Sequence, residues 1–335
     1  MRTGKYGRSL KRRRRKRTVR LIIVSIITIL IAGILTTTKV SGRNKAAEGR
    51  ETEEQQTQYE EKHVEASEVT PQVSAEDVGL GELEEILEEM TADEDGIWSI
   101  YVKNLDTDES ISMNNQSMYA ASLIKLFVME NSFSEIDELA DHAAVYGGSE
   151  DTAYDYVLET LSNMIEVSDN ESYNELVRLH SSELSFTEGC LAVNAYLKES
   201  CYENTGIYHT LSPSNTESEK TADIRNYTSA EDCGILLESI YDGTCVSEEA
   251  SGMMLDFLLN QQVVNKIPAG LPPDISVANK TGETDETQHD AAIVFGEKTD
   301  YILCVMSSDV TDPESAEAMI QSISGEVYQY LNGGQ

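Results

Sequence analysis

The sequence predicts an α+β domain, in which strands from both ends of the folded region pair into one antiparallel sheet and helices fill the middle. Strand-like runs at residues 97–103 and 110–113 open the region, joined by a turn-rich segment. Three further strand-like runs close it, at residues 275–281, 291–295 and 301–307. The stretch between these two groups has apolar residues at helical spacing. We therefore expect the first and last segments of the domain to lie side by side.

The predicted helices have apolar faces, and several have recognisable starts. Thr228-x-x-Glu231 is typical of a capping box and predicts a helix over residues 228–241, and Ser247 is the expected N-cap of a helix that runs to residue 259. A final helix follows Asp312-Pro313, because proline suits the first turn of a helix. The remaining predicted helices cover residues 81–90, 122–130, 152–167 and 188–197.

The charge of the chain is divided sharply between its N-terminus and the rest. Residues 1–20 hold 11 Lys or Arg and no acidic residue, which leaves 14 basic against 60 acidic residues and a net charge of −46 in the remainder. The strongly negative charge of residues 21–335 argues against nucleic acid as a binding partner. The basic block is better explained by the apolar segment that follows it.

Residues 21–38 contain no charged residue, and 18 residues of helix just cross the hydrocarbon core of a bilayer. The positive-inside rule then predicts a single-pass membrane anchor, with residues 1–20 in the cytoplasm and the folded domain outside the cell. A cleaved signal peptide is the alternative, with a small-residue site at Val40-Ser-Gly42. Residues 39–80 are polar and acidic and predict a disordered linker, so the folded domain occupies residues 81–335.

Three short motifs carry the chemistry of the chain. They are Ser122-Leu-Ile-Lys125, Ser168-Asp169-Asn170 and Lys280-Thr281-Gly282, and they follow one another at intervals of 46 and 112 residues. Together they supply what an acyl-transfer serine enzyme needs when its base is a lysine. Each motif alone has an ordinary structural explanation as a helix cap, a snorkelling lysine or a turn. Their occurrence in this order within one domain favours catalysis.

The first two motifs predict the groups that move protons. Ser122 and Lys125 lie one turn apart on a helix, and an apolar setting lowers the pKa of the lysine so that it can accept the serine proton. Ser122 is then the nucleophile. The hydroxyl of Ser168 is expected to relay a proton to the departing nitrogen, and the amide of Asn170 to hydrogen-bond both Lys125 and the substrate.

The third motif predicts a substrate-binding strand. Lys280 supplies a fixed positive charge for a substrate carboxylate, and Thr281 donates a hydrogen bond to the same carboxylate. Gly282 lets the ligand approach the backbone. The N–H groups of Ser122 and Glu283 are the expected oxyanion hole.

Other catalytic arrangements fit less well. His289 and Asp290 are neighbours on a predicted strand, where their side chains point to opposite faces, so we expect them at the cleft edge or in a turn rather than in a Ser-His-Asp triad. The five cysteines follow no metal-ligand spacing and are interpreted as small buried hydrophobic residues, although a disulfide between distant segments remains open. No metal or cofactor is expected.

With these motifs, residues 95–333 resemble the penicillin-recognising serine hydrolases, and class A β-lactamases most closely. The resemblance extends to Met118-Tyr-Ala-Ala-Ser122, to Ala269-Gly-Leu-Pro272 before the third motif, and to Asn226-Tyr-Thr-Ser-Ala-Glu231. It implies a five-stranded antiparallel sheet beside a helical lobe. It also implies that a β-lactam or a D-Ala-type peptide acylates Ser122.

The chain departs from the class A pattern in one place. Class A enzymes activate the hydrolytic water with an omega-loop glutamate that has an asparagine four residues later. No glutamate between Ser168 and Lys280 has this partner, and Ser212-Pro213 stands where Glu-Pro is expected. Glu217 and Glu219 are candidate substitutes. The resemblance therefore implies a serine acyl-hydrolase of the class A β-lactamase type, which opens β-lactam rings through an acyl-enzyme on Ser122. The alternatives are a cell-wall DD-peptidase-like penicillin-binding protein that deacylates slowly and a non-catalytic wall-binding module.

Overall fold

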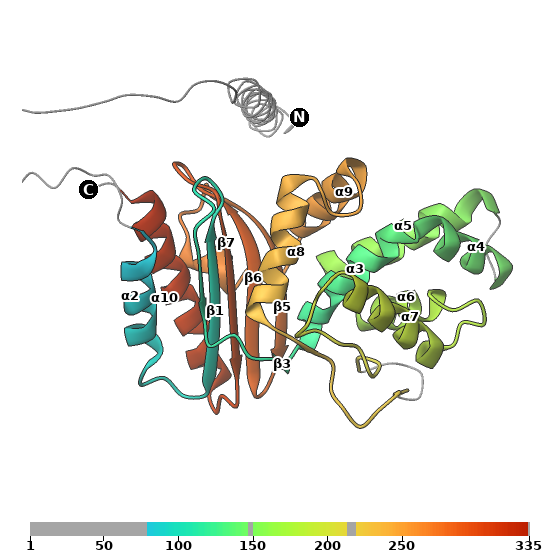
Figure 1. Ribbon diagram of the computed structural model, residues 1–335, viewed down its shortest axis with the longest axis horizontal. Helices are drawn as coiled ribbons and strands as arrows, with labels where there is room; N and C mark the ends of the chain where they lie inside the picture. The colour runs from blue at the N-terminus through green and yellow to red at the C-terminus, as the bar shows by residue number, and fades with distance from the viewer. Residues whose placement is uncertain (1–78, 147–149, 213–218, 334–335) are drawn as a thin grey trace, which may run out of the picture. The chain divides into compact units, whose positions relative to one another are not determined.

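The computed structural model describes residues 79–146, 150–212 and 219–333 (Figure 1). All of them belong to one of the two units of the chain, residues 73–335. The predicted cytoplasmic segment, the anchor and nearly all of the linker lie outside the described residues. Within the described ranges, no helix combines the length and hydrophobicity that a membrane span requires.

An antiparallel sheet of five strands, in the order β2-β1-β7-β6-β5, is built from the two ends of the described part of the chain. The central pairing of β1 with β7 joins the N-terminal and C-terminal segments, which confirms the predicted α+β fold. Strand β5 lies at one edge of the sheet, next to the helices of the lobe (Figure 1). The strands are β1 (Ile97–Asn104), β2 (Ser110–Met113), β5 (Ser276–Thr284), β6 (Thr287–Phe295) and β7 (Tyr301–Ser308).

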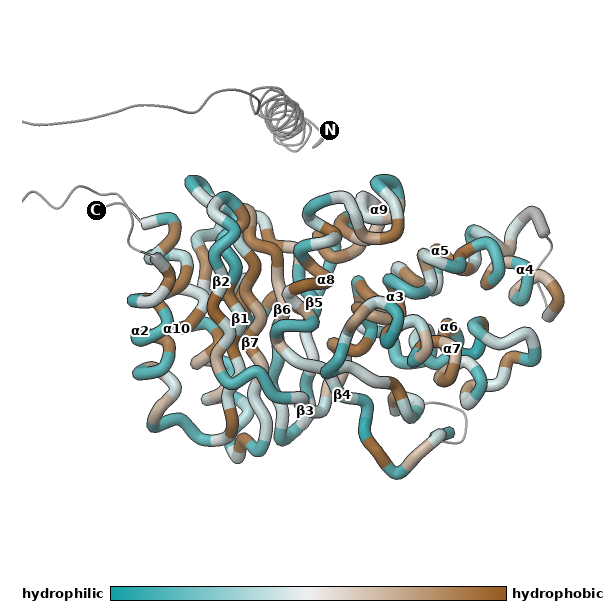
Figure 2. Tube along the Cα trace, in the orientation of Figure 1, coloured by the Kyte–Doolittle hydropathy of each residue, from teal (hydrophilic) through white to brown (hydrophobic). Residues whose placement is uncertain are grey.

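Helices α2 (Gly81–Thr91) and α10 (Pro313–Asn332) cover one face of the sheet (Figure 1). Alternate residues of β1 point to opposite faces, as a pleated strand requires: Val102 joins the core under these two helices, and Tyr101 joins the core of the other face. Hydrophobic positions are concentrated in β6 and β7, in the middle of the sheet (Figure 2). Both faces of the sheet are therefore covered.

The other face carries α8 (Ala230–Asp242) and the helical lobe. A Cβ on Gly234 of α8 would lie 2.3 Å from the ring of Tyr101, so only glycine allows α8 this close to the sheet. In the lobe, residues 124–133 of α3 are all buried, as expected for a helix that is surrounded by others. The lobe consists of α3 (Ile124–Ser134), α4 (Ile136–Tyr146), α5 (Glu150–Glu166), α6 (Asn170–Leu179), α7 (Phe186–Glu199) and α9 (Glu248–Leu259).

Two local expectations need correction. The capping box at Thr228 is wrong, because Ser229 is the N-cap of α8 and accepts a hydrogen bond from Asp232 N. Thr228 instead belongs to the short strand β4 (Tyr227–Thr228), which pairs with β3 (Met118–Tyr119). The interpretation of His289 and Asp290 as cleft-edge or turn residues is also wrong, because both are fully buried in β6.

Candidate active site

The predicted nucleophile, Ser122, lies in a 3-10 turn, Ala121–Leu123, that precedes the buried helix α3. The turn is anchored by a hydrogen bond from Ala120 N to Asn226 O of 2.9 Å. Ala121 has φ 45, a conformation that costs on the order of 1–3 kcal/mol for a residue with a side chain. The serine side chain itself is only half-buried. The fold therefore holds the backbone of this turn rigidly and leaves the hydroxyl accessible.

Lys125 is fully buried one turn further on, and its amine is saturated with partners of suitable chemistry. Its Nζ donates to Ser168 O and to Asn170 Oδ1, both at 2.7 Å, and lies 3.1 Å from Ser122 Oγ. Burial, and then the charge of Lys280, lowers the pKa of Lys125 to about 6. A neutral amine has two N–H groups, which the carbonyl and the amide oxygen can use. Its lone pair is then left to accept the proton of Ser122.

The hydroxyl of Ser168 lies between the two amines of the site. Its Oγ is 3.2 Å from Lys125 Nζ and 2.9 Å from Lys280 Nζ. Ser168 has φ 58 at the end of the loop between α5 and α6, and Asp169 fixes that loop as the N-cap of α6, accepting from Ser172 N at 2.6 Å. The predicted relay is thus in position to exchange protons with either amine.

Lys280 is fully buried in β5, and its Nζ also donates to Thr281 O at 2.8 Å. Burial lowers the pKa of Lys280 to about 7, and the negative charge of Asp290 opposes this shift. The positive charge that the sequence predicts at Lys280 therefore depends on pH, because burial brings the pKa of the amine to about 7. A bound substrate carboxylate would favour the charged form.

Gly282 marks the closest approach between β5 and the nucleophile turn. A Cβ at this position would lie 3.1 Å from Ala120 O and 3.2 Å from Ser122 N, so the two backbones are nearly in contact. This contact places the peptide that carries Glu283 N beside the one that carries Ser122 N. The oxyanion role of these two N–H groups remains a prediction.

Sequence analysis missed a buried lysine next to this strand. Lys266 is fully buried, and its Nζ lies 2.6 Å from Oε2 of Glu283, whose side chain is 57% exposed. Asp290 accepts hydrogen bonds from Ile267 N, next to Lys266 in the chain, and from Asn279 Nδ2. Burial raises the pKa of Asp290 to about 6. Lys266 belongs to no motif, and its only signal is its position just before the Ala269-Gly-Leu-Pro272 run.

His289 contributes to the site indirectly. Burial lowers the pKa of His289 to about 4, so the ring is neutral at physiological pH. Its Nε2 lies 2.9 Å from Tyr119 O and its Nδ1 lies 3.2 Å from Ser307 N. The ring therefore links β7 to the short strand that leads into Ser122, which explains why it occupies a strand interior.

The class A resemblance places the deacylation base on the loop that contains Ser212 and Glu219, and the polar groups of this loop contact α6 rather than the nucleophile. Glu219 Oε1 lies 2.6 Å from Arg178 Nη2 of α6, and Asn170 Nδ2 donates to Ser212 O. The structure therefore does not bring Glu219 to the nucleophile, and Glu217 lies outside the described residues. In the part of the chain that is described, neither Ser122 nor Lys125 has a hydrogen bond to a carboxylate.

Residues that could bind a metal do not gather near these groups. The described ranges hold no cluster of three or more His, Cys, Asp or Glu with metal-binding geometry. All five cysteines are unpaired thiols, and four of them are buried; the exposed one is Cys201.

An α+β fold with a serine, a buried lysine and a second serine converging at the edge of its sheet defines a serine hydrolase of the penicillin-recognising type. The chain belongs to the beta-lactamase enzyme family, whose model matches residues 82–331. No curated protein sequence matches the chain.

Solved structures share the fold at low sequence identity. PBP-A superposes with a TM-score of 0.61 at 24% identity, covering 75% of this chain and 96% of that one. The L158E mutant of PBP-A, solved as an acyl-enzyme complex with penicillin G, gives 0.58 at 25% identity over 74% and 94% of the two chains. A β-lactamase from Sphaerobacter thermophilus gives 0.60 at 17% identity over 76% and 98%.

Proposed function

We propose that the protein is a serine acyl-transfer enzyme for D-Ala-type cell-wall peptides. β-Lactams also acylate its Ser122, and the acyl group that they leave there is released only slowly. The observation that carries this proposal is the fully buried amine of Lys125, whose Nζ lies 3.1 Å from Ser122 Oγ and whose pKa burial lowers to about 6. In its neutral form the amine can donate to Ser168 O and Asn170 Oδ1 and keep a lone pair for the proton of Ser122.

The proposed reaction begins when Ser122 Oγ attacks the scissile carbonyl carbon and Lys125 Nζ takes the hydroxyl proton. The carbonyl oxygen becomes an oxyanion at the N–H groups of Ser122 and Glu283. As the C–N bond breaks, Ser168 gives its proton to the departing nitrogen and is reprotonated by a neighbouring amine. The product is an ester on Ser122 and a free amine. Water or an acceptor amine then completes the transfer.

Slow release of the acyl group is supported by the contacts of the 200–228 loop. Ser212 stands where the class A resemblance expects a glutamate, and its carbonyl accepts the Asn170 amide. The carboxylate of Glu219 is engaged by Arg178. A water molecule near the ester would therefore lack a carboxylate base from these two positions. The L158E mutant of PBP-A, which shares this fold, was solved as an acyl-enzyme complex with penicillin G.

β-Lactam hydrolysis is the second candidate, and the family model favours it by its description. It requires that Glu217, outside the described residues, act as the base. A non-catalytic wall-binding module has less support. Keeping an amine neutral and buried costs several kcal/mol of folding free energy, which recognition alone would not require.

The location of the enzyme is also a proposal, and it rests on the sequence alone. The basic block at residues 1–20 and the apolar segment at residues 21–38 support a membrane anchor that holds the domain outside the cell. Wall peptides with D-Ala ends would be accessible there.

Intact mass spectrometry of the full chain with a penicillin tests the function. We expect an adduct with the mass of the whole penicillin, persisting for minutes or longer, and none on Ser122→Ala. A transient adduct with accumulating hydrolysed penicillin would favour the β-lactamase. Absence of any adduct on a folded chain would contradict acyl transfer.

A further inference from the structure

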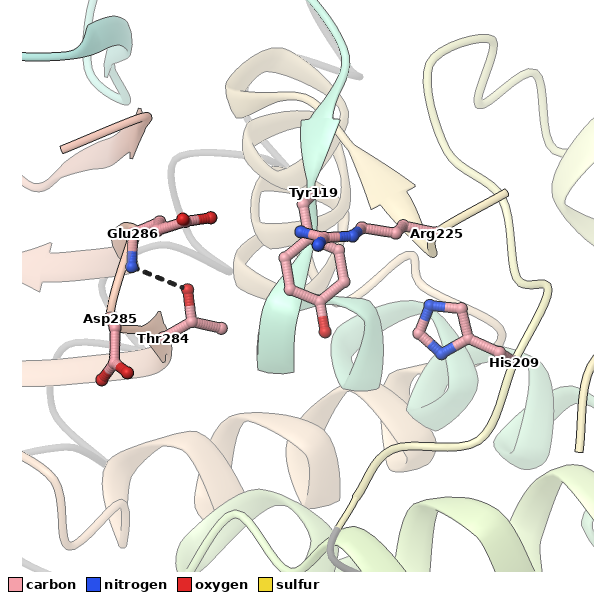
Figure 3. Close-up of a pocket in the computed structure, with 6 residues that line it drawn as sticks. All are labelled: Tyr119, His209, Arg225, Thr284, Asp285 and Glu286. Atoms are coloured by element: carbon pink, nitrogen blue, oxygen red, sulfur yellow. Dashed lines mark hydrogen bonds between the residues drawn. The ribbon is translucent and has the colours of Figure 1, made fainter. Parts of the chain in front are cut away.

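A cavity of about 380 Å³ opens beside the nucleophile turn and has no role in the reaction proposed above (Figure 3). Tyr119 precedes Ser122 by three residues, and Thr284 follows Gly282 by two, so the cavity adjoins the catalytic centre. It is lined by Tyr119, His209 and Arg225 on one side and by Thr284, Asp285 and Glu286 on the other.

The direction of β5 decides which part of a substrate reaches this cavity. Ser168 and Lys280 lie together at the leaving-group end, where Lys280 Nζ contacts Ser168 Oγ. From Lys280 the strand passes Gly282 at the nucleophile and continues to Thr284, and it has no partner strand on its outer edge in the described sheet. An extended ligand that places its carbonyl at Ser122 therefore sends its acyl side toward residues 284–286.

Tyr119 and His209 form a fixed aromatic wall of the cavity. Their rings stack with centroids 6.3 Å apart, and Tyr119 pairs with Tyr227 in the two-stranded sheet. His209 Nε2 accepts from Asn226 N at 3.2 Å, and its Nδ1 donates to Thr210 O at 2.8 Å. Both ring nitrogens of His209 are therefore engaged by main-chain groups, and the two rings give this wall its shape.

Arg225 places an available cation on this wall. Its guanidinium carbon lies 5.0 Å from the centroid of the Tyr119 ring, within cation–π range (Figure 3). Among the described residues it makes no ion pair with a carboxylate. Its planar group of N–H donors is oriented by stacking and matches a carboxylate of a ligand.

The opposite wall carries negative charge. Asp285 and Glu286 occupy the turn between β5 and β6, which is shaped by a hydrogen bond from Glu286 N to Thr284 Oγ1 of 3.2 Å. The side chain of Glu286 points toward the Tyr119 and Arg225 side of the cavity (Figure 3). Neither carboxylate has an ion-pair partner in the described ranges. These carboxylates would attract an ammonium group.

We propose that this cavity binds a zwitterionic amino-acid end group on the acyl side of the substrate. Arg225 receives its carboxylate, and Asp285 with Glu286 receives its ammonium. A ligand with only an ammonium or only a carboxylate leaves one of the two walls without an ion-pair partner, whereas a zwitterion pairs with both walls. The proposal rests on the acyl-transfer function of the same site, because that function fixes the direction of the ligand.

Four acyl donors test the proposal on the full chain. They share one scissile D-Ala-type amide and differ only at the end of the acyl-side chain: zwitterionic, ammonium alone, carboxylate alone, or uncharged. We expect the acylation rate constant, followed by intact mass, to be about tenfold higher for the zwitterion than for any other donor. High salt should reduce this advantage, because the groups are exposed to solvent. Equal rates for all four donors would overturn the proposal.

Charge-neutralising variants assign the two ends of the ligand. Arg225→Gln should remove the advantage of the zwitterion over the ammonium-only donor. Glu286→Gln should remove its advantage over the carboxylate-only donor. Matched controls are Lys198→Gln on α7 and Glu89→Gln on α2, exposed positions with the same change of charge. If the controls reduce the preference equally, the effect comes from overall charge and the cavity is not the site.

Equilibrium binding separates failure of this proposal from failure of the acyl-transfer function. The zwitterionic and uncharged peptides are titrated calorimetrically into the full chain carrying Ser122→Ala. If no donor acylates the parent but the zwitterion still binds about tenfold tighter, and Arg225→Gln abolishes the difference, the cavity assignment stands without the chemistry. If all donors acylate the parent and both peptides bind equally, the chemistry stands and the cavity assignment is wrong.

Discussion

The nucleophile site and the described part of the 200–228 loop meet at Asn170, but they are built by different means. Around Ser122, groups from α3, the α5–α6 loop and β5 form a chain of contacts of 2.9–3.2 Å, from Ser122 through Lys125 and Ser168 to Lys280. Burial lowers the pKa values of both lysines. On the loop, the described polar groups bind the protein itself: Ser212 O contacts Asn170, and Glu219 contacts Arg178.

This difference separates the two halves of an acyl-transfer reaction. Forming the ester needs a deprotonated serine, and the packing of the core supplies the base for it. Releasing the ester needs an activated water, and the described part of the loop does not place a carboxylate for that purpose. The comparison therefore predicts that acylation and deacylation respond to different substitutions.

The largest effect is expected from Lys125→Met, which removes the base and keeps the volume of the side chain. We expect the rate of acylation by penicillin to fall by about 10³-fold, within the range for loss of a general base. The free energy of unfolding in urea should rise, because an apolar chain replaces a buried amine. A variant that keeps the parental acylation rate would show that another group deprotonates Ser122.

The next effect concerns deacylation and compares two glutamates on the loop. Glu219→Gln should leave the decay rate of the acyl-enzyme unchanged, because this carboxylate is bound to Arg178. Glu217→Gln should also leave it unchanged if release is uncatalysed. A drop of about 10²-fold in Glu217→Gln alone, measured by the decay of the adduct mass, would identify a general base and favour the β-lactamase.

Gly282→Ala tests the contact between the two backbones at the nucleophile. The added methyl group would lie 3.1–3.2 Å from backbone atoms of residues 120 and 122, so β5 or the turn must shift by a few tenths of an ångström. We expect acylation to slow by about tenfold with little change in deacylation, since the oxyanion donors move apart. Unaltered acylation would place the oxyanion donors elsewhere.

The last prediction concerns stability rather than rate, and it is a pH dependence. The folded pKa values of Lys125 and Lys280, about 6 and about 7, lie below the unfolded value of about 10.4. Between these limits the unfolded chain binds more protons, so the unfolding free energy rises with pH. Each lysine contributes up to about 1.4 kcal/mol per pH unit. Urea titrations at pH 7 and 9 should show a shallower rise in Lys125→Met than in the parent; equal slopes would mean that Lys125 is charged in the fold.

Sequence alone predicted those parts of the molecule that local patterns encode. The strands at both ends, Ser247 as a cap and the helix after Asp312 are all confirmed, because alternation and capping chemistry act over a few residues. Helix α4 was not predicted. At the start of α8, Ser229 takes the N-cap position that the sequence assigned to Thr228, since pairing of β4 with β3 takes the threonine into a strand.

The site was predicted to the extent that its residues lie in motifs. The two serines and two lysines converge as the spacing suggested, but the ion pair of Lys266 with Glu283 joins segments that no pattern connects. The partial loss of charge on Lys280 likewise follows from three-dimensional burial and not from its neighbours in sequence. Contacts between distant segments decide both features.

The near contact of Gly282 with the nucleophile turn also limits how this protein can diversify. At that point the cleft has no room for even one more carbon atom without displacing main chain. Related proteins that accept bulkier or differently charged molecules are therefore expected to differ from this one at the end of β5, around residues 284–286. We expect that turn to vary in length and charge among relatives, while the middle of β5 keeps its shape.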